Sequence, residues 1–435
     1  MIIHIVQPGE TIDSIAKEYN VDTERLILEN GLRYPYNLAV GQAIVITYPE
    51  LVYTIQEGDT LSGIAESHGV SVMELLRNNP YLTNRDFIYP GETIVIAYKK
   101  EKRRRIATSG YAYPFINENV LRKTLPFLTY LIVFHYRITA EGEFIETDDA
   151  EIIQLAKDYG VAPILFASTL SADEVGDIEV TYKIVNNPEV QERAIDNILR
   201  ILREKGYAGL NIYIQFLNLE NRSRIERYVT KLAEILHSEG LKLILSVTPR
   251  IILEPNLIRF EEIDYSILAN AVDEILFFEY SGGYNLAAPG TVAPVNLLES
   301  SLDFALTMVP PDKILMGVPT MGYDWELPYV PGVSRANAVT TNAAEQIAAD
   351  YGVPIYFHPV AQAPYFYYIS ENQLEHLVWF KDARSFVAIA RLVPRYGLSG
   401  LVIWNIMNFN NQLWLIINID YEIEKVPDIF RSDCR

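Results

Sequence analysis

The chain has 435 residues, 49% of them apolar, which is enough for one large and several smaller domains and excludes a disordered chain. A formal net charge of −20 disfavours nonspecific binding to nucleic acid or to anionic membrane surfaces. The single cysteine, Cys434, excludes an internal disulfide and a cysteine-rich zinc site, and we predict no metal and no cofactor. The sequence contains no apolar run of about 18 residues that would predict a membrane span, and no secretory signal is visible.

The first hundred residues contain a repeat. The segments that align are His4–Thr11 with Tyr53–Thr60, and Gly41–Ile46 with Gly91–Ile96. Each copy predicts a strand, a turn, two helices and a closing strand. The residues placed to form the turn and to cap the following helix occupy equivalent positions in both copies: Gly9 and Thr11, and Gly58 and Thr60.

Both copies resemble LysM modules, at 1–48 and 51–98. The likeness rests on a strand followed by x-x-Gly-[Asp/Glu]-Thr, a helix carrying Ile-Ala, an Asn, and a closing Gly-x-x-Ile-x-Ile strand. It implies binding to glycans that contain N-acetylglucosamine, either peptidoglycan or chitin, between the loop after the first strand and the loop before the last. The candidate substrate-binding residues in those loops are Gly9, Thr11, Gly58 and Thr60. A structural role, as turn and helix cap, explains these residues at least equally well.

Residues 99–108 contain the basic run Lys99–Arg105 in an otherwise acidic protein. Such runs are typical of solvated linkers, which is the role we expect. Contact with an anionic wall polymer is the alternative.

From about Ser109 onward, apolar runs alternate with helical segments. Most of the runs are rich in Ile, Val, Leu and Phe, as strands buried on both faces should be. The predicted strands are Gly110–Tyr113, Tyr130–Tyr136, Ala162–Ala167, Gly209–Gln215, Lys242–Val247, Glu274–Tyr280, Lys313–Val318 and Gly400–Asn405. This alternation predicts an α/β fold, a (β/α)₈ TIM barrel over 109–435, with a small α+β insertion at about 326–384.

In such a barrel, chemistry takes place at the carboxyl ends of the strands. Several segments there resemble the landmarks of family 18 glycoside hydrolases: Gly206–Ile212, Pro310–Pro319, Gly322–Tyr329, Val378–Arg384 and Gly400–Trp404. The closer match is the spore-type branch, in which two LysM modules precede the barrel. The resemblance implies an N-acetylglucosaminidase architecture that acts on spore cortex peptidoglycan fragments, and a location in the spore coat, the cortex or the cell wall.

The family's hallmark, Asp-x-x-Asp-x-Asp-x-Glu, is altered in this chain. The aligned positions are Ala208, Asn211, Tyr213 and Gln215. The resemblance implies that the glutamate protonates the departing oxygen and that the preceding aspartate orients the substrate's acetamido group. Gln215 cannot supply that proton, and loss of one general acid typically costs roughly 10²–10⁴ in rate. On strand six, Tyr280 is followed by Ser281, where the family usually has an acidic residue.

Three interpretations follow. In the first, the barrel is a degenerate hydrolase whose sugar cleft keeps the aromatic residues Tyr280, Trp404, Tyr323, Trp325 and Trp379, although Trp404 and Tyr280 could instead fill the barrel top. In the second, another carboxyl group supplies the acid. Glu279 lies beside Tyr280 but alternation turns it to the other side of the strand, whereas Asp324 and Glu326 follow strand seven and could reach the cleft. In the third, the sequence is an engineered inactive mutant, which the additional changes at Ala208 and Tyr213 disfavour. We expect a glycan-binding protein with weak or absent hydrolysis, and an active N-acetylglucosaminidase is the alternative.

Overall fold

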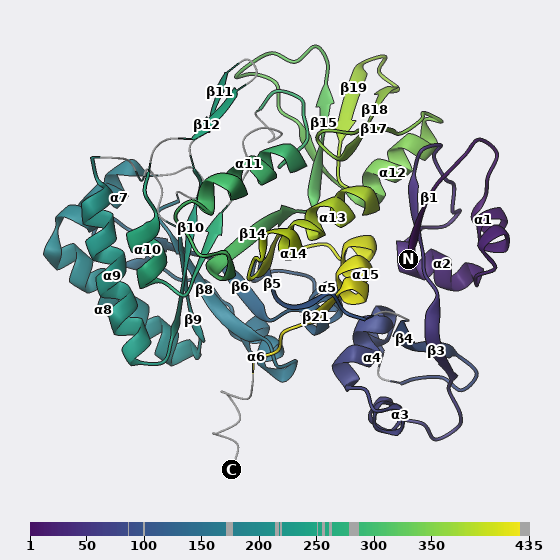
Figure 1. The fold of residues 1–435 in the computed structure, drawn as a ribbon, viewed down its shortest axis with the longest axis horizontal. Helices are drawn as coiled ribbons and strands as arrows, with labels where there is room; N and C mark the ends of the chain where they lie inside the picture. Colours follow the sequence, from purple (N-terminus) through teal and green to yellow (C-terminus); the bar gives the residue numbers. More distant parts are fainter. Residues whose placement is uncertain are drawn as a thin grey trace.

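The computed structural model describes residues 1–85, 87–98, 101–170, 177–213, 217, 220–249, 251–254, 257–260, 263–277 and 287–426. Two small N-terminal modules lie beside a large barrel domain, and both are next to helix α15 (Asn411–Asp420) (Figure 1). Among the helices in these ranges, none combines the length and the apolar character needed to cross a bilayer.

Each module has the predicted order of elements. The first comprises β1 (Ile2–Ile5), α1 (Ile12–Tyr19), α2 (Thr23–Asn30) and β2 (Ala43–Ile46). The second comprises β3 (Pro49–Thr54), α3 (Leu61–His68), α4 (Val72–Asn78), the 3₁₀ helix η1 (Pro80–Asn84) and β4 (Thr93–Tyr98). In both, the first and last strands pair antiparallel, so the repeat in the sequence is a repeat in the structure.

The asparagine shared by the two modules fastens the second helix to the last strand. The Asn30 amide donates to the carbonyls of Leu26 (3.0 Å) and Val45 (2.9 Å), and its oxygen accepts from the Val45 amide (2.7 Å). Asn79 makes the same three bonds in the second module, to Leu75 and Val95. Because both residues are buried, these bonds satisfy backbone groups that water cannot reach.

The threonines at the start of α1 and α3 are helix caps. Thr11 Oγ1 accepts from the Ser14 amide (3.2 Å), and Ser14 Oγ accepts from the Thr11 amide (2.9 Å). Thr60 Oγ1 accepts from the Gly63 amide (3.0 Å). Gly9 and Gly58 precede these caps with φ of +85° and +88°, which favours glycine. The structural interpretation of these residues therefore has direct support.

We expect Thr11→Ala to lower the free energy of unfolding by about 1 kcal/mol, because the Ser14 amide loses its acceptor at the helix start. Thr11→Ser keeps the oxygen and should retain most of that stability. Urea denaturation followed by circular dichroism measures both variants. A loss of glycan affinity with unchanged stability would instead place the Thr11 hydroxyl in contact with sugar.

The predicted barrel is confirmed. Its parallel strands are β5 (Arg104–Ala112), β6 (Tyr130–Ile138), β8 (Ala162–Ser168), β9 (Gly209–Tyr213), β10 (Lys242–Val247), β13 (Glu274–Phe277), β14 (Ile314–Pro319) and β20 (Gly400–Trp404). Pairing of β5 with both β20 and β6 closes the sheet. Helices α5 (Glu118–Thr124), α6 (Ala150–Asp158), α7 (Ile178–Asn186), α8 (Pro188–Lys205), α9 (Arg222–Ser238), α10 (Ser266–Ala271), α11 (Val295–Ala305), α13 (Ala383–Ala390), α14 (Leu392–Tyr396) and α15 belong to the connections and the C-terminal end.

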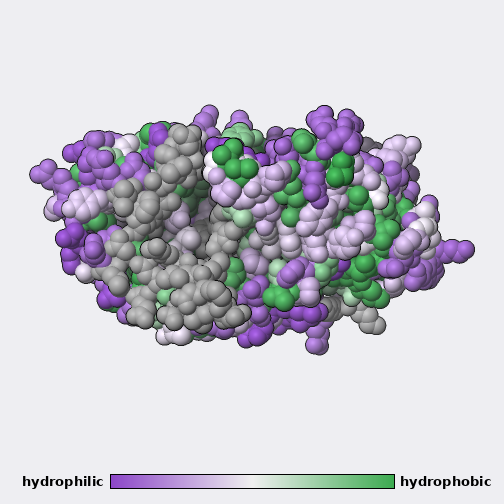
Figure 2. Space-filling view, turned by 90° about the horizontal axis from the view of Figure 1, so that it is seen from above, coloured by the Kyte–Doolittle hydropathy of each residue, from purple (hydrophilic) through white to green (hydrophobic). Residues whose placement is uncertain are grey.

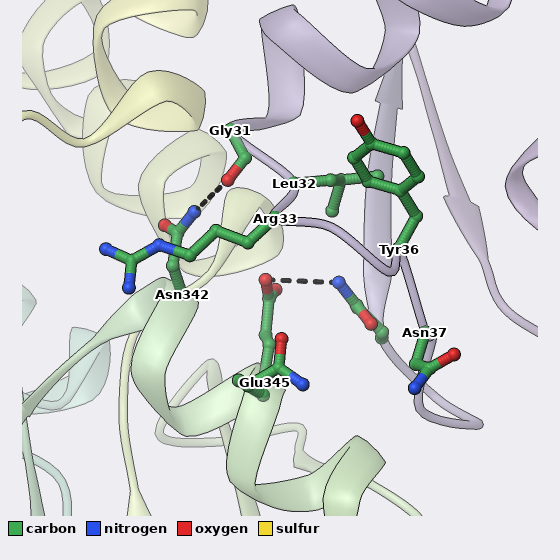
Figure 3. A pocket seen from close by; sticks show the side chains of 9 residues that line it. Gly31, Leu32, Arg33, Tyr36, Asn37, Asn342 and Glu345 are labelled. Carbon is green, nitrogen blue, oxygen red and sulfur yellow. Dashed lines mark hydrogen bonds between the residues drawn. The ribbon is translucent and has the colours of Figure 1, made fainter.

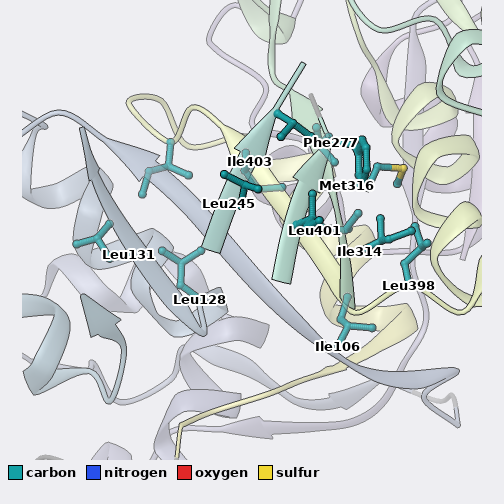
Figure 4. Packing of buried hydrophobic residues seen from close by; sticks show 14 of the residues in the cluster. Ile106, Leu128, Leu131, Leu245, Phe277, Ile314, Met316, Leu398, Leu401 and Ile403 are labelled. Atoms are coloured by element: carbon teal, nitrogen blue, oxygen red, sulfur yellow. The ribbon is translucent and has the colours of Figure 1, made fainter. Parts of the chain in front are cut away.

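Alternation along each strand divides the core into two shells, because successive side chains point to opposite faces. Leu245, Phe277, Met316 and Ile403 point outward and pack in the large cluster beneath the helices (Figure 4). Their inward neighbours form a separate cluster that fills the barrel: Ile244, Leu276, Leu315 and Val402. This two-sided burial explains why the strands have nearly continuous apolar sequences.

The insertion between β14 and β20 is a five-stranded sheet with one helix. Its elements are β15 (Met321–Glu326), β16 (Asn337–Thr340), α12 (Thr341–Asp350), β17 (Tyr356–His358), β18 (Ala363–Ile369) and β19 (Glu375–Trp379). It begins at Met321, a few residues before the expected start, because β15 follows β14 almost directly.

The basic run after the second module contacts the barrel. Arg103 pairs with Asp420 (3.3 Å), and Lys102 donates to the carbonyl of Asn418. Strand β5 begins at Arg104, where it pairs with β21 (Tyr421–Ile423). The expectation of a solvated linker over 99–108 is therefore corrected for its described part, because a strand from the far end of the chain returns to this edge.

The first module is fastened to the barrel by the amide side chains of α15. Gln412 donates to the carbonyl of Ala43 (2.8 Å), and Asn411 donates to that of Leu28 (2.8 Å). Gly41 lies so close to the insertion that a Cβ there would stand 2.1 Å from the carbonyl oxygen of Ile355. This contact and a φ of +86° make glycine necessary at the interface.

The second module is fastened to the same helix at Asn418, six residues beyond Gln412. Asn418 donates to Asn78 Oδ1 (2.7 Å) and accepts from Arg77 Nε (3.3 Å). Arg77 also reaches the carbonyl of Pro126 (3.3 Å), at the base of the barrel. Helix α15 thus holds both modules in one arrangement.

Candidate functional site

Asn211 is locked inside the barrel. It is fully buried on β9, where its Nδ2 donates to Ser246 Oγ (2.8 Å) and to the carbonyl of Ile244 (3.1 Å). Its Oδ1 accepts from the Tyr111 hydroxyl (2.6 Å). Both polar atoms of the amide are therefore engaged with β5 or β10.

An aromatic layer covers Asn211 at the carboxyl ends of the strands. Tyr111 lies 5.4 Å from Phe166 and 5.1 Å from Trp404, centroid to centroid. Phe134 stacks on Phe166 at 5.0 Å and meets Trp404 edge-on at 4.9 Å. These distances are those of favourable aromatic pairs. In the described part of the barrel, aromatic side chains thus pack together at the top of the interior.

Tyr213 extends this layer. Its ring lies parallel to Phe166 at 6.4 Å, with an interplanar angle of 26°. Its hydroxyl lies 3.1 Å from Thr248 Oγ1, beyond the end of β10. The side chain is partly exposed and packs against the aromatic cluster. A half-buried aromatic ring therefore occupies the strand position at which the family 18 hallmark has an aspartate.

Aromatic residues that the sequence reasoning missed continue the layer toward solvent. Tyr113 meets Phe134 edge-on at 4.9 Å and lies 5.1 Å from Phe115. Phe115 is 77% exposed. The sequence could have indicated them, because Tyr113 and Phe115 follow the carboxyl end of the first barrel strand, where the site of such a barrel lies. Together with the half-buried Trp404, they form a path of ring faces from the barrel interior to the surface.

Three aromatic residues of the insertion, Tyr323, Trp379 and Tyr365, share one face of its sheet. Tyr323 is paired across the sheet with Trp379, whose ring stacks on Tyr365 at 4.6 Å. Tyr323 and Trp379 are half-buried and present part of their rings. Trp325 is different: it is 1% exposed, and its indole N–H donates to the carbonyl of Ala287 (3.1 Å). Trp325 therefore has no free face for a sugar in this structure.

Asp324 lies on the opposite face of β15. Its two oxygens accept from the Tyr368 hydroxyl (2.7 Å) and from His376 Nδ1 (2.9 Å). It is 6% exposed. Strand alternation places Glu326 on this same face, away from Tyr323. Neither carboxylate has the placement of a relocated acid beside the aromatic layer.

Four residues of the predicted site fall outside the described residues. They are Gln215, Glu279, Tyr280 and Ser281. The structure thus brings Asn211, Tyr213 and Trp404 together at the barrel top. It places Tyr323 and Trp379 in the insertion, and Gly9, Thr11, Gly58 and Thr60 in the N-terminal modules (Figure 1).

A family model described as glycosyl hydrolases family 18 matches residues 177–408, which is more than half of the chain. The chain belongs to glycosyl hydrolases family 18. The LysM domain matches residues 4–47 and 53–97, which identifies both N-terminal modules as LysM domains.

Several relatives align with this chain over nearly its whole length. The cortical fragment-lytic enzyme of Bacillus subtilis is 28% identical over 435 residues, which span 98% of this chain and 99% of the relative. The solved structure of the Bacillus cereus spore cortex-lytic enzyme SleL superimposes with a TM-score of 0.79 at 29% identity, and covers 98% of this chain and 99% of that one. SleL of Bacillus megaterium gives the same TM-score at 28% identity.

In this family 18 domain, a buried lysine joins the insertion to the loop after β13. Lys381 is 1% exposed, and its ammonium donates to the carbonyl of Ala293 (3.1 Å) and to Thr291 Oγ1 (3.2 Å). Burial lowers the pKa of Lys381 to about 7, against an opposing effect of Asp382. Lys381 is thus the described side chain that bonds the insertion to this loop, and its pKa lies well below the ordinary lysine value.

We expect stability to rise with pH between about 7 and the ordinary lysine value of 10.5. In that window the unfolded chain binds a proton at Lys381 that the folded chain has released, so the slope approaches about 1.4 kcal/mol per pH unit. Below about pH 7 both states are charged and this contribution to the slope disappears. Urea midpoints measured across the window should rise less in Lys381→Met than in the wild type. Equal slopes would contradict the assignment to Lys381.

Proposed function

We propose that this protein binds N-acetylglucosamine-containing glycan of peptidoglycan through its LysM modules and its family 18 barrel, with hydrolysis weak or absent. The proposal places it in the spore cortex or the cell wall, as the names of its full-length relatives suggest. The observation that carries it is Tyr213, whose ring packs on Phe166 where the family pattern has a carboxylate.

Two further features support weak hydrolysis. The sequence carries an amide at Gln215, where the family has the proton donor, and an amide cannot act as an acid. The substitute carboxylate at Asp324 is enclosed by Tyr368 and His376. Meanwhile the ring faces of Phe115, Tyr113 and Trp404 remain at the barrel top, where a sugar ring could stack on them. Among the residues that the space-filling view from above colours, hydrophobic ones are interspersed with hydrophilic ones (Figure 2).

The experiment is a paired measurement on the full chain. Purified protein should sediment with insoluble peptidoglycan or chitin, and should release reducing ends from peptidoglycan fragments and chito-oligosaccharides no faster than the buffer blank. Robust release that is lost in Glu326→Gln or Asp324→Asn would favour the alternative, an active N-acetylglucosaminidase with a different acid. Absence of sedimentation with either polymer would refute the binding function.

A further inference from the structure

A cleft lies between the two LysM modules and the barrel domain. Its volume is about 1820 Å³ including its open mouth, so it has room for a ligand of several residues. Helix α2 of the first module lines one wall, and α4, η1 and β4 of the second module line another. Helix α15 and the end of α5 supply the third wall (Figure 1). Residues from all three units line the cleft, so it exists only in the assembled chain.

The walls of this cleft are held in place by bonds between the domains. Asn411, on α15, donates to the carbonyl of Leu28 on α2 (2.8 Å). At the end of α2, the Gly31 carbonyl accepts from Asn342 of the insertion (2.5 Å) (Figure 3). The bonds of Asn418 hold the second module to the same helix. The cleft is therefore formed before a ligand arrives, which lowers the entropy cost of binding.

Arg77, in the last turn of α4, brings to this cleft a cation that has no ion-pair partner among the described residues. Its Nε and Nη1 donate to neutral groups, Asn418 Oδ1 and the carbonyl of Pro126 (3.3 Å each). Its Nη2 forms no bond within the described part of the chain and is not enclosed. Burial lowers the pKa of Arg77, and the charges of Glu74 and Glu422 oppose this effect. A guanidinium with a free nitrogen is well suited to bind a carboxylate.

Two lysines add positive charge to the same wall. Lys425 donates to two carbonyls of the turn around Pro126 (2.6 and 3.1 Å), the turn that Arg77 also contacts. Lys123 precedes Pro126 by three residues and lines the cleft. Within the described ranges, neither lysine pairs with a carboxylate. Three cations thus gather around one turn without a neutralising group, an arrangement that favours an anion in the cleft.

The other charges that line the cleft indicate what kind of anion fits. Glu29 and Glu92 are already paired with arginines. Asp22 and Glu24 are exposed at the start of α2, in the wall formed by the first module. These carboxylates would repel a polymer that carries a negative charge in every repeat, such as a phosphate-linked wall polymer. A ligand with a localised carboxylate can bind at Arg77 and keep clear of them.

Apolar side chains line the cleft beside these charges. Leu28 is 48% exposed, and Tyr81 and Phe409 are half-buried. Arg85 and Pro90 form part of the rim, in the loop before the last strand of the second module. The LysM resemblance places the glycan at this loop. A peptide attached to that glycan would therefore begin at the mouth of the cleft, with apolar surface and cations within it.

We propose that this cleft binds the peptide that peptidoglycan carries on its glycan. A carboxylate of the peptide binds at Arg77 Nη2, attracted also by Lys123 on the same wall, and the apolar part of the peptide lies against Leu28 and Phe409. The inference rests on the proposed function, in which the LysM modules bind the glycan. It adds that the protein distinguishes glycan that bears peptide from glycan that does not.

The first test compares two soluble peptidoglycan fragments, one with the carboxylates of its peptide free and one with them amidated, in calorimetric titrations of the full chain. We expect the wild type to bind the free-carboxylate fragment about tenfold more tightly, or by about 1.4 kcal/mol, and added salt to reduce this preference. Lys123→Gln should reduce the preference to about threefold, and Arg77→Gln should reduce it to less than about twofold.

Lys157→Gln is the matched control and should keep the wild-type preference. Lys157 is a half-buried lysine on α6 whose pKa burial also lowers, and it does not line the cleft. Arg77→Gln also removes the bonds to Asn418 and Pro126, so its urea midpoint is measured alongside. If Arg77→Gln does not fold, Lys123→Gln alone decides, because Lys123 forms no hydrogen bond in the described structure.

Equal affinity of the wild type for the two fragments would overturn the proposal, as would an unchanged preference in both variants. A soluble phosphate-linked polymer is titrated as well. If it binds the wild type, loses affinity in the same variants and the fragments show no preference, the cleft belongs to that polymer and the proposal is wrong.

A chito-oligosaccharide without peptide separates this inference from the function on which it rests. It should bind the wild type and both variants within about twofold of one another, because it has no carboxylate to meet the cations. If it does not bind the wild type at all, the proposed glycan binding fails. The free peptide, with and without amidation, would then test the cleft by itself.

Discussion

Tyr213→Asp combined with Gln215→Glu should raise the release of reducing ends from N-acetylated oligosaccharides by roughly 10²–10⁴-fold over wild type. The glutamate restores a proton donor for the leaving oxygen. The aspartate restores a negative charge at the end of β9 and removes the ring that packs on Phe166. Reducing-end assays on chito-oligosaccharides and peptidoglycan fragments measure the gain.

The two single variants are the controls. Residues that act together in catalysis are not additive, so each single change should recover much less than the pair. Tyr213→Asn with Gln215→Glu removes the tyrosine ring without adding the negative charge of an aspartate. It therefore separates the effect of removing the ring from the effect of the charge. A double variant that binds glycan but stays inactive would show that other parts of the catalytic geometry have also been lost. High activity in the wild type would contradict the premise that Tyr213 and Gln215 have cost the protein its hydrolysis.

The largest expected loss of stability comes from Trp414→Ala, at about 3–5 kcal/mol. Trp414 is 1% exposed on α15 and lies 5.2 Å from Phe127, centroid to centroid. Removing the indole leaves a cavity between α15 and the base of the barrel. The same helix carries Gln412 and Asn418, which hold the two LysM modules.

Trp414→Ala should therefore lower the stability of the barrel domain and also weaken the attachment of the LysM modules to it. The urea midpoint should fall, and protease cleavage between the modules and the barrel should accelerate. Trp414→Phe fills most of the space and should cost clearly less. Leu415→Ala, at a neighbouring buried position of the same helix, controls for a general loss of apolar surface. Equal midpoints for Trp414→Ala and wild type would mean that the helix is not held by this contact.

The barrel strands could be predicted because their apolar runs are local in the sequence. Strand β10 runs over the predicted Lys242–Val247, and β9 and β13 start at the predicted Gly209 and Glu274. The start of β5 could not be predicted in this way. Arg104 and Arg105 have charged side chains, and they join the sheet only because Tyr421–Ile423 pairs with them from the other end of the chain.

The site was predictable at the positions that the family resemblance marks, and not where contacts with residues distant in the sequence decide the outcome. Asn211 and Tyr213 were identified because they align with the hallmark of family 18, and both belong to the barrel interior or its rim. The confinement of Asp324 depends on Tyr368 and His376, which lie 44 and 52 residues away in sequence. No local pattern connects these three residues. The exposure of Phe115 likewise depends on packing around the barrel mouth.

The attachment of both LysM modules to one helix affects how the protein responds to the length of its ligand. Modules on a flexible tether would find successive positions on any strand, with an effective concentration set by the tether. Here Ala43 and Asn78 are bonded to Gln412 and Asn418, six residues apart on α15, so the distance between the modules is set by the fold. The two modules are therefore held at a fixed spacing. Avidity should appear only for strands whose repeat matches that spacing, and short oligomers should bind one module at a time.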